Sequence, residues 1–348
     1  MNEHCTYQIA VIIPCWNCEA YIGEMLDCLL NQTFTDWKAF LVDDGCTDRT
    51  AAIINDYALK DARINYVQRN RNPKGAQTCR NIGFELSEGA KYVVFFDADD
   101  LIAPYCLEQR VEYLEKYKEL DFAIFPMKSF QENIYDENNW VWGVQFVEDN
   151  FKAFLNWNLP FVVVTNIYCR QSLVDYDLAW DERLLSMQDS VFNIHALALG
   201  MRYEYAQNVK FDYFYRIGHN GLAKKIMMQK HFDSHFILLK DVTEVLVRAY
   251  GEKYDFYIQN YILIFLFQIF CDDRKALLRM ISMPYVKKHS LFRVRLVVYL
   301  ALNRRGRSYI FSKYLRYSRS LRMQWEEHMK SNADKFRLES LRSWPISN

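Results

Sequence analysis

An acidic triplet follows a run of apolar residues at 92–100, where the sequence is YVVFFDADD. The apolar run predicts a buried strand, and Asp97, Asp99 and Asp100 come at its carboxyl end. Ligands of open α/β sheets bind just outside that end. Clustered carboxylates repel one another, so a cation normally lies among them, and Mg²⁺ or Mn²⁺ carrying a diphosphate is the usual one. The alternative is a solvated acidic turn in which Asp100 caps the next helix, because DxD triplets are common by chance.

The first third of the chain alternates strand and helix patterns at short intervals. Strands are predicted over 9–14, 37–43, 64–68, 92–96 and 122–126, and helices over 19–30, 48–59, 75–86 and 104–117. Such alternation is typical of a parallel, doubly wound sheet, whose right-handed crossovers bring the carboxyl ends of the strands to one edge. The residues expected to converge at that edge are Pro14, Trp16, Asp43, Asp44, Asp97 and Asp99.

An aromatic ring and several carboxylates at one sheet edge suit a nucleotide, with the ring for the base and the acids for the base edge, the ribose or a metal. No GxGxxG follows the first strand and no GxxxxGK[ST] occurs, which disfavours dinucleotide and P-loop folds. Thr47 and Asp48 are expected only to turn the chain and to cap the next helix.

Several segments, taken in their order and spacing, resemble a family 2 glycosyltransferase of the GT-A fold. They are AVIIPCWNCEAYI, LLNQTF, LVDDGCTDRT, RNPKGAQTCRNIGFELSEG and YVVFFDADD, followed by NIYCR at 166–170 and WDERLLSMQDSVFN at 180–193. The likeness covers about residues 7 to 220. It implies an α/β, Rossmann-like domain in residues 1–230, with a mixed, mostly parallel sheet and helices on both faces. A helical C-terminal region would occupy residues 231–348.

The resemblance implies a binding site for a nucleotide-sugar donor. Pro14, Trp16 and Asp44 match positions that hold the nucleotide base in the family, with Trp16 where a tyrosine is usual. Arg80 matches an arginine on the helix beside the donor. Asp97 matches the first acid of the DxD pair, which usually lies near the ribose. The donor that we expect is a UDP-sugar.

The resemblance also implies a metal ion and a catalytic base. Asp99 and Asp97 match the acids that hold Mg²⁺ or Mn²⁺ on the diphosphate, and His219 is a further candidate ligand. Such a cation neutralises charge on the departing oxygens. Asp189 matches the general base of an inverting transfer, and a positioned base contributes about 10²- to 10⁴-fold in rate. Judged from the local sequence alone, Asp189 is more simply an N-cap for a helix over 190–198.

Three further residues depart from the family pattern. Gln188 stands where a glutamate usually precedes the base, so Asp189 has one like-charged neighbour fewer and its pKa is raised less. Thr165 and Ile167 replace a Trp and a Lys that are common around Asn166, at positions expected to face the acceptor. These changes leave open a non-catalytic module that binds a nucleotide sugar without transferring it.

A second alternative rests on Cys15 and Cys18, a CxxC at the end of a strand and the start of a helix, as in thioredoxin-like redox enzymes. It explains nothing beyond residue 30. Zinc binding is disfavoured because no second CxxC or HxxxH completes a site. The nine cysteines, an odd number without a disulfide-like pattern, indicate a reducing, cytosolic setting.

Basic residues are concentrated near the C-terminus: 274–325 holds fourteen Lys or Arg and no Asp or Glu, although the net charge of the whole chain is zero. Within it, 310–325 has apolar and aromatic residues at helical spacing opposite basic ones, which predicts a helix lying on an anionic membrane surface. The alternative is a helix packed on the catalytic domain. The resemblance disfavours nucleic acid, a third interpretation of the same charge.

The two longest apolar runs, 261–271 and 294–302, are too short to span a bilayer. We therefore expect a cytoplasmic enzyme, peripheral on the inner face of the plasma membrane. Its expected acceptor is a glycan or lipid-linked glycan of a bacterial surface polysaccharide.

Overall fold

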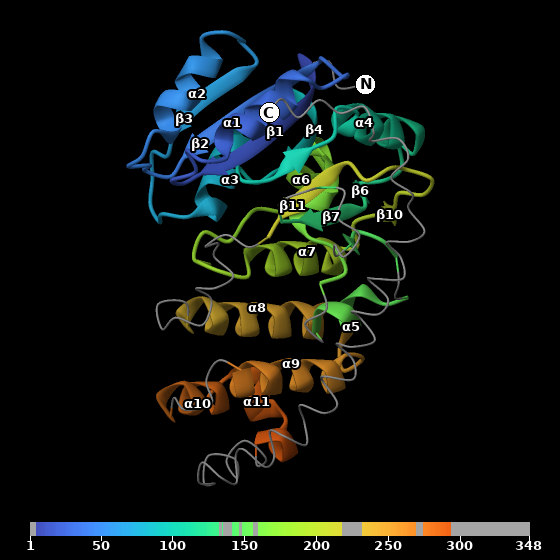
Figure 1. Cartoon of the computed structure of the whole chain (residues 1–348). Coiled ribbons are helices and arrows are strands. Elements are labelled where there is room, and N and C mark those ends of the chain that lie inside the picture. The colour runs from blue at the N-terminus through green and yellow to red at the C-terminus, as the bar shows by residue number, and fades with distance from the viewer. Residues whose placement is uncertain are drawn as a thin grey trace.

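Two β-sheets with packed helices form the N-terminal part of the chain (Figure 1). The computed structural model describes residues 5–131, 134, 141–145, 148–155, 159–217, 232–268 and 274–293. The larger sheet has seven strands in the order β10-β6-β9-β4-β1-β2-β3. They are β1 (Tyr7–Cys15), β2 (Trp37–Asp43), β3 (Ile64–Gln68), β4 (Ala90–Phe95), β6 (Phe122–Ile124), β9 (Asn166–Cys169) and β10 (Tyr203–Tyr205).

Most neighbouring strands in this sheet run parallel: β1 pairs in parallel with both β2 and β4, and β2 with β3. The exception is β9, which lies between β4 and β6 and is antiparallel to both. The predicted α/β class with a mixed, mostly parallel sheet is confirmed. β9 lies beyond the strand–helix alternation of the first third and is expected only from the resemblance, in which NIYCR at 166–170 matches a strand of the family.

The smaller sheet has the order β5-β11-β7-β8 and lies beside the acidic triplet. Its strand β5 (Leu101–Ile102) directly follows Asp100 and pairs antiparallel with β11 (Tyr213–Arg216). The other two strands are β7 (Met127–Phe130) and β8 (Val141–Trp142). A distant part of the chain, β11, is thereby brought next to the triplet.

The predicted helices of the first half are present as α1 (Ile22–Leu30), α2 (Thr50–Ala58), α3 (Ala76–Glu85) and α4 (Cys106–Lys116), and α6 (Arg170–Asp175) follows β9. Of these, α3 packs against β1 and β2. A Cβ atom on Gly83 would lie 2.4 Å from Cγ2 of Ile12, so a glycine lets α3 approach β1 this closely. The close approach determines where the side chains of α3 point at the sheet edge.

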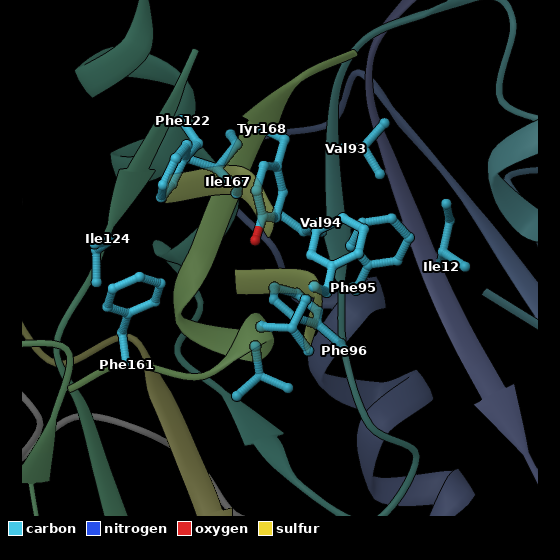
Figure 2. Packing of buried hydrophobic residues seen from close by; sticks show 14 of the residues in the cluster. Ile12, Val93, Val94, Phe95, Phe96, Phe122, Ile124, Phe161, Ile167 and Tyr168 are labelled. Atoms are coloured by element: carbon cyan, nitrogen blue, oxygen red, sulfur yellow. The ribbon is translucent and has the colours of Figure 1, made fainter. Parts of the chain in front are cut away.

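The central strands bury apolar side chains on both faces, as expected for strands covered by helices. Figure 2 shows part of this core, in which the ring centroid of Phe95 lies 6.0 Å from that of Tyr168 of β9. Ile167 and Thr165 are both fully buried. The expectation that these two positions face the acceptor is therefore wrong, because β9 and the turn before it, η1 (Val163–Thr165), are enclosed by the core.

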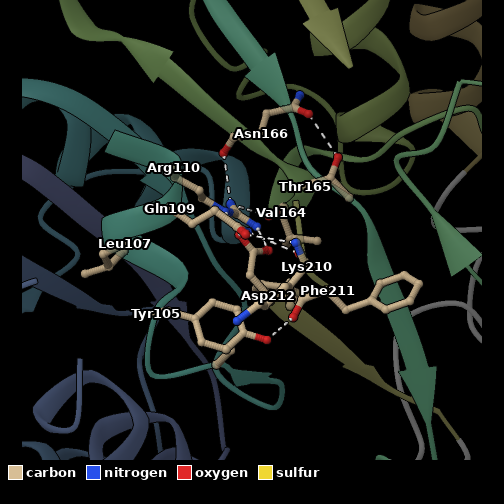
Figure 3. Close-up of polar contacts among 12 residues, drawn as sticks. Tyr105, Leu107, Gln109, Arg110, Val164, Thr165, Asn166, Lys210, Phe211 and Asp212 are labelled. Atoms are coloured by element: carbon tan, nitrogen blue, oxygen red, sulfur yellow. Dashed lines mark hydrogen bonds and ion pairs between the residues drawn. The ribbon is translucent and has the colours of Figure 1, made fainter. Parts of the chain in front are cut away.

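A buried ion pair fastens β11 to the main body of the domain (Figure 3). Arg110 on α4 and Asp212 are both fully buried, with Nη2 and Oδ1 2.8 Å apart. Nε of Arg110 donates to Oδ2 of Asp212 at 2.9 Å, and Nη1 donates to the carbonyl oxygens of Val164 at 3.0 Å and Asn166 at 3.3 Å. Every charge in this pair is thus matched at short range.

Replacing Asp212 by alanine is expected to lower the free energy of unfolding by about 3–5 kcal/mol, because the guanidinium of Arg110 would be left buried without its partner. Urea denaturation followed by tryptophan fluorescence measures this change. The double variant Arg110→Met/Asp212→Leu is the control and should lose much less, since it buries no unpaired charge. An Asp212→Ala loss no larger than that of an average point substitution, about 1 kcal/mol, would contradict the prediction.

Four helices follow the last described strand, β11, in the described part of the chain: α8 (Phe232–Tyr250), α9 (Asp255–Gln268), α10 (Arg274–Ile281) and α11 (Pro284–Lys288). Two further helices, α5 (Asn150–Leu155) and α7 (Gln188–Ala198), come between strands in the sequence. In Figure 1, α7, α8 and α9 lie in successive layers away from the sheets. α8 contacts α7 and the turn before it: the Leu185 amide donates to Oγ of Ser234 at 2.8 Å, and Arg183 pairs with Asp241 at 3.0 Å.

The predicted helical character of the C-terminal region is confirmed in its described part. The predicted boundary at residue 230 and the basic segment 310–325 lie outside the described residues, so both stay predictions. Among the described helices, none has the length and apolar character needed to cross a membrane.

Candidate active site

The carboxylates of the site gather around Arg80, which α3 presents at the sheet edge. Its Nη2 donates to Oδ1 of Asp97 at 2.7 Å, and its Nη1 lies 3.5 Å from Oδ1 of Asp189. The guanidinium also lies over the ring of Trp180, 4.5 Å from its centroid. Burial alone would lower the pKa of Arg80, but the two carboxylates raise it above its usual value. Asp97 and Asp189, which are predicted from motifs far apart in the sequence, therefore both pair with the guanidinium of Arg80.

Asp189 lies in the first turn of α7, one residue after Gln188. Burial raises the pKa of its carboxyl to about 6; Arg80 opposes this shift and Asp97 adds to it. The N-cap position belongs to Met187, so the interpretation of Asp189 as a helix cap is wrong. A carboxylate with a pKa near the working pH is suited to accept a proton from a substrate.

Asp100 lies beneath the site, with 1% of its surface exposed. The Tyr213 hydroxyl donates to its Oδ2 at 2.7 Å, and the backbone N–H of Arg216 donates to its Oδ1 at 2.8 Å. The Tyr213 hydroxyl also accepts the backbone N–H of Asp97 at 3.1 Å. Burial and the neighbouring acids raise the pKa of Asp100 well above its usual range. Both of its oxygens are thus engaged within the protein, which fixes the backbone of the triplet.

The alternative in which Asp100 caps the next helix is also wrong, because α4 begins at Cys106 with Tyr105 in the cap position. No sequence pattern indicates this role of Tyr213, because β11 lies more than a hundred residues further along the chain.

Asp99 is half-buried beside Asp97. Its carbonyl oxygen accepts the Nε–H of Arg216 at 2.8 Å. Arg216 is itself held by an ion pair with Glu24 and lies over the ring of Phe130, 4.6 Å from its centroid. These contacts fix the peptide that carries Asp99.

The residues present fit a magnesium or manganese ion. Arg80 uses Oδ1 of Asp97, which leaves Oδ2 of that side chain, and Asp99 supplies a second carboxylate. Hard oxygen donors of this kind, one or two per site together with substrate phosphates, are what Mg²⁺ prefers. Within the described ranges, no group of three or more His, Cys, Asp or Glu side chains is arranged to hold an ion by itself. His219, the further candidate ligand, lies outside the described residues.

The predicted base-binding residues lie at the ends of β1 and β2. Asp44 is buried, and its Oδ1 accepts the Nε–H of Arg69 at 2.7 Å and the backbone N–H of Gly75 at 3.0 Å. Trp16 is 52% exposed, and Nζ of Lys74 lies 5.0 Å from its ring centroid. An exposed indole and a buried carboxylate are thus available for a planar base. Arg69 and Lys74 were not predicted, because nothing in their spacing sets them apart from other surface cations.

Pro14 and Cys15 end β1, and the backbone N–H of Asp44 donates to the carbonyl oxygen of Cys15 at 2.9 Å. Asp43 has a local structural role: its Oδ1 accepts the backbone N–H groups of Gly45 and Cys46, and its Oδ2 accepts the Tyr66 hydroxyl. Burial alone would raise the pKa of Asp43, but these hydrogen bonds lower it. Asp43 therefore shapes the turn that presents Asp44.

Cys15 and Cys18 are both free thiols and both buried, Cys15 completely. Their mutual hydrogen bond raises the pKa of Cys15 and lowers that of Cys18. A thiol–disulfide oxidoreductase needs an accessible attacking thiolate. The buried position of the pair does not provide one.

Helix α3 joins the two ends of the site. At its start, Gly75 contacts Asp44, and one and a half turns later Arg80 reaches Asp97 and Asp189. The segment before α7 is held by the same helix, because Nδ2 of Asn81 donates to Oε1 of Glu182 at 3.0 Å and to the carbonyl oxygen of Trp180 at 2.9 Å. One helix, α3, therefore contacts both the predicted base-binding end of the site and the end that holds the carboxylates.

The fold is that of the GT-A glycosyltransferases. It matches the crystal structure of residues 1–349 of TarS from Staphylococcus aureus in complex with UDP-GlcNAc, with a TM-score of 0.60, 19% sequence identity and 79% of each chain covered. Residues 10–178 match the family model described as glycosyl transferase family 2. Residues 10–178, just under half of the chain, are thus similar to this family.

EpsJ and TarS are examples of proteins that are similar to the chain over about two thirds of its length. One is the uncharacterized glycosyltransferase EpsJ of Bacillus subtilis, with 29% identity over 66% of this chain and 67% of EpsJ. The other is the poly(ribitol-phosphate) beta-N-acetylglucosaminyltransferase TarS of Staphylococcus aureus, with 26% identity over 69% of this chain. The match spans only 39% of the length of TarS.

Proposed function

We propose that this chain transfers one sugar, with inversion, from a nucleotide-diphosphate donor to a hydroxyl group of an acceptor. The observation that carries the proposal is the buried Arg80, which holds Asp97 of the DxD pair and Asp189 of the acidic segment at one point. This arrangement puts a carboxylate with a pKa of about 6 next to the acids suited to a diphosphate.

Asp189 is the general base in this proposal. It accepts the proton of the acceptor hydroxyl while that oxygen bonds to the anomeric carbon. The bond from the anomeric carbon to the diphosphate oxygen breaks on the opposite face, and the nucleoside diphosphate leaves. Attack from the face opposite the leaving group inverts the anomeric centre.

Pro14, Trp16 and Asp44 bind the nucleotide base, with the indole of Trp16 against its face and the Asp44 carboxylate at its edge. UDP is the nucleotide that we favour. The support is the similarity to TarS, whose crystal structures include complexes with UDP and UDP-GlcNAc.

Asp99 and Asp97 hold a Mg²⁺ or Mn²⁺ ion, with His219 as a further candidate ligand. Bound there, the ion supplies positive charge to the departing diphosphate. Arg80 keeps Asp97 oriented and balances its charge.

Residues 1–230 form the catalytic domain in this proposal, and residues 231–348 a helical region that contacts an anionic membrane surface. The acceptor is a glycan or lipid-linked glycan of a surface polysaccharide, and the protein acts at the cytoplasmic face. Flotation of the full chain with anionic vesicles tests the membrane contact, and an absence of binding would remove its support.

Release of the free nucleotide (UDP, GDP or CMP) from a panel of UDP-, GDP- and CMP-sugars tests the transfer itself. We expect turnover with a UDP-sugar, and a rate that rises with pH through about 6, because Asp189 must lose its proton before it can act as a base. A rate that falls as pH rises through this range would contradict the assignment of Asp189.

A further inference from the structure

Two glutamine side chains, Gln77 on α3 and Gln188 at the start of α7, form a buried amide pair. Nε2 of Gln188 donates to Oε1 of Gln77 at 2.7 Å and to the carbonyl oxygen of Leu184 at 3.1 Å. Nε2 of Gln77 donates to the carbonyl oxygen of Glu182 at 3.1 Å. Gln77 is fully buried and Gln188 is 9% exposed. The pair therefore ties the segment before Asp189 to α3.

The same bonds orient Gln188 toward Arg80. The amide nitrogen of Gln188 donates to the oxygens of Gln77 and Leu184, so its Oε1 points the other way. This oxygen lies 3.4 Å from Nη1 of Arg80. This amide supplies an acceptor without a negative charge. The cation of Arg80 is therefore balanced by Asp97 and Asp189, the two acids with which it pairs.

Gly75 provides the space that the amide of Gln77 occupies. A Cβ atom on Gly75 would lie 2.4 Å from Oε1 and 2.6 Å from Nε2 of Gln77, and the φ of Gly75 is +146°. The backbone N–H of Gly75 donates to Asp44. Gly75 thus lies between the amide of Gln77 and the predicted base-binding acid.

Met187, just before the pair, has a left-handed backbone with φ 59°. A non-glycine residue adopts this conformation when its surroundings impose it, and such residues cluster at functional sites. Met187 directly precedes Gln188, whose amide nitrogen is bonded to Gln77 and Leu184.

We propose that the Gln77–Gln188 pair is the positioning element that sets the first turn of α7, so that Asp189 faces the reacting centre beside Arg80. This inference rests on the proposed function for the role of Asp189. A glutamate at position 188, usual in the family, has no N–H to donate and would face the oxygens of Gln77 and Leu184. The glutamine at 188 is therefore matched to the glutamine at 77 in this chain.

The test compares Gln77→Ala, Gln188→Ala and the double variant, with Gln171→Ala on the exposed face of α6 as the control. Each single variant should lower kcat about 10²-fold, the cost of misplacing a catalytic group by about 1 Å, and should leave the dissociation constant of the donor unchanged. The kcat of the double variant should be no lower than that of the less active single variant, because both substitutions remove the same contact.

Gln188→Glu adds a negative charge beside Asp189, so it should move the acidic limb of the pH–rate profile above pH 6. A shift of this limb identifies Asp189, the neighbour of residue 188, as the group whose protonation limits the rate at low pH. Single-variant effects on kcat that match the control, or that multiply in the double variant, would overturn the proposal.

A carboxyl ¹³C titration of Asp189 separates this inference from the proposed function. If the wild type releases no nucleoside diphosphate, the proposed function fails, yet Gln188→Glu should still raise the pKa of Asp189 above that of the wild type. An unchanged pKa of Asp189 in this variant would overturn the inference whatever the turnover.

Discussion

Asp189→Asn is expected to reduce turnover by about 10²- to 10⁴-fold, the usual contribution of a positioned general base. Asparagine keeps the size of the side chain and can still pack beside Arg80, but its amide cannot take the proton of the acceptor hydroxyl. The dissociation constant for the donor should change little, since the predicted donor contacts come from other residues. Steady-state release of nucleoside diphosphate and calorimetric titration of the donor measure the two quantities.

Asp175→Asn, on the exposed surface of α6, is the matched control and should retain wild-type turnover. The comparison also separates the transferase from a module that only binds a nucleotide sugar. A wild type that binds the donor but shows no turnover, with Asp189→Asn indistinguishable from it, would favour the binding module.

Asp99→Ala is expected to abolish the metal dependence of the reaction and to lower turnover by about 10³-fold or more, because several kcal/mol of charge stabilisation on the leaving group would be lost. The backbone around Asp99 should persist, since Arg216 holds its carbonyl oxygen and Tyr213 holds Asp100. Turnover measured against Mg²⁺ and Mn²⁺ concentration reports this effect.

Asp56→Ala, an exposed acid on α2, removes the same charge away from the site and should leave the metal dependence intact. Retention of a wild-type metal response by Asp99→Ala would contradict the assignment of this acid to the cation.

Much of the edge of the sheet could be predicted from strand ends alone. Pro14 lies at the end of a strand, and Asp44 and Asp97 follow two others, all with clear patterns. Parallel pairing of β1 with β2 and β4 brings these residues to one edge. Asp189 was placed by family resemblance, because its local sequence resembles that of an ordinary helix start.

The contacts that hold these acids in place were not predictable in the same way. Tyr213 reaches Asp100 because β11 pairs with β5, and neither strand is long enough to give a reliable period. Gln77 lies on the buried side of a helix where an amide has no distinctive spacing. At its partner position, 188, the sequence shows only that a glutamine replaces the usual glutamate. A single sequence does not indicate which distant residues form a hydrogen bond.

The prediction about the acceptor side of the site was wrong at two buried positions. Ile167 and Thr165 differ from the family pattern, and the expectation was that they face the acceptor. In the folded chain they lie inside the core, where an isoleucine is the ordinary choice. Their identity therefore says nothing direct about the acceptor.

Calorimetric titration of the full chain with UDP, GDP and CMP, each with Mn²⁺ and again with EDTA, tests the central claim most directly. The proposed donor site predicts that UDP binds in the presence of the metal and that EDTA abolishes or strongly weakens this binding. Binding of none of the three nucleotides under either condition would contradict the claim that the edge formed by Trp16, Asp44 and Asp99 is a nucleotide-sugar site.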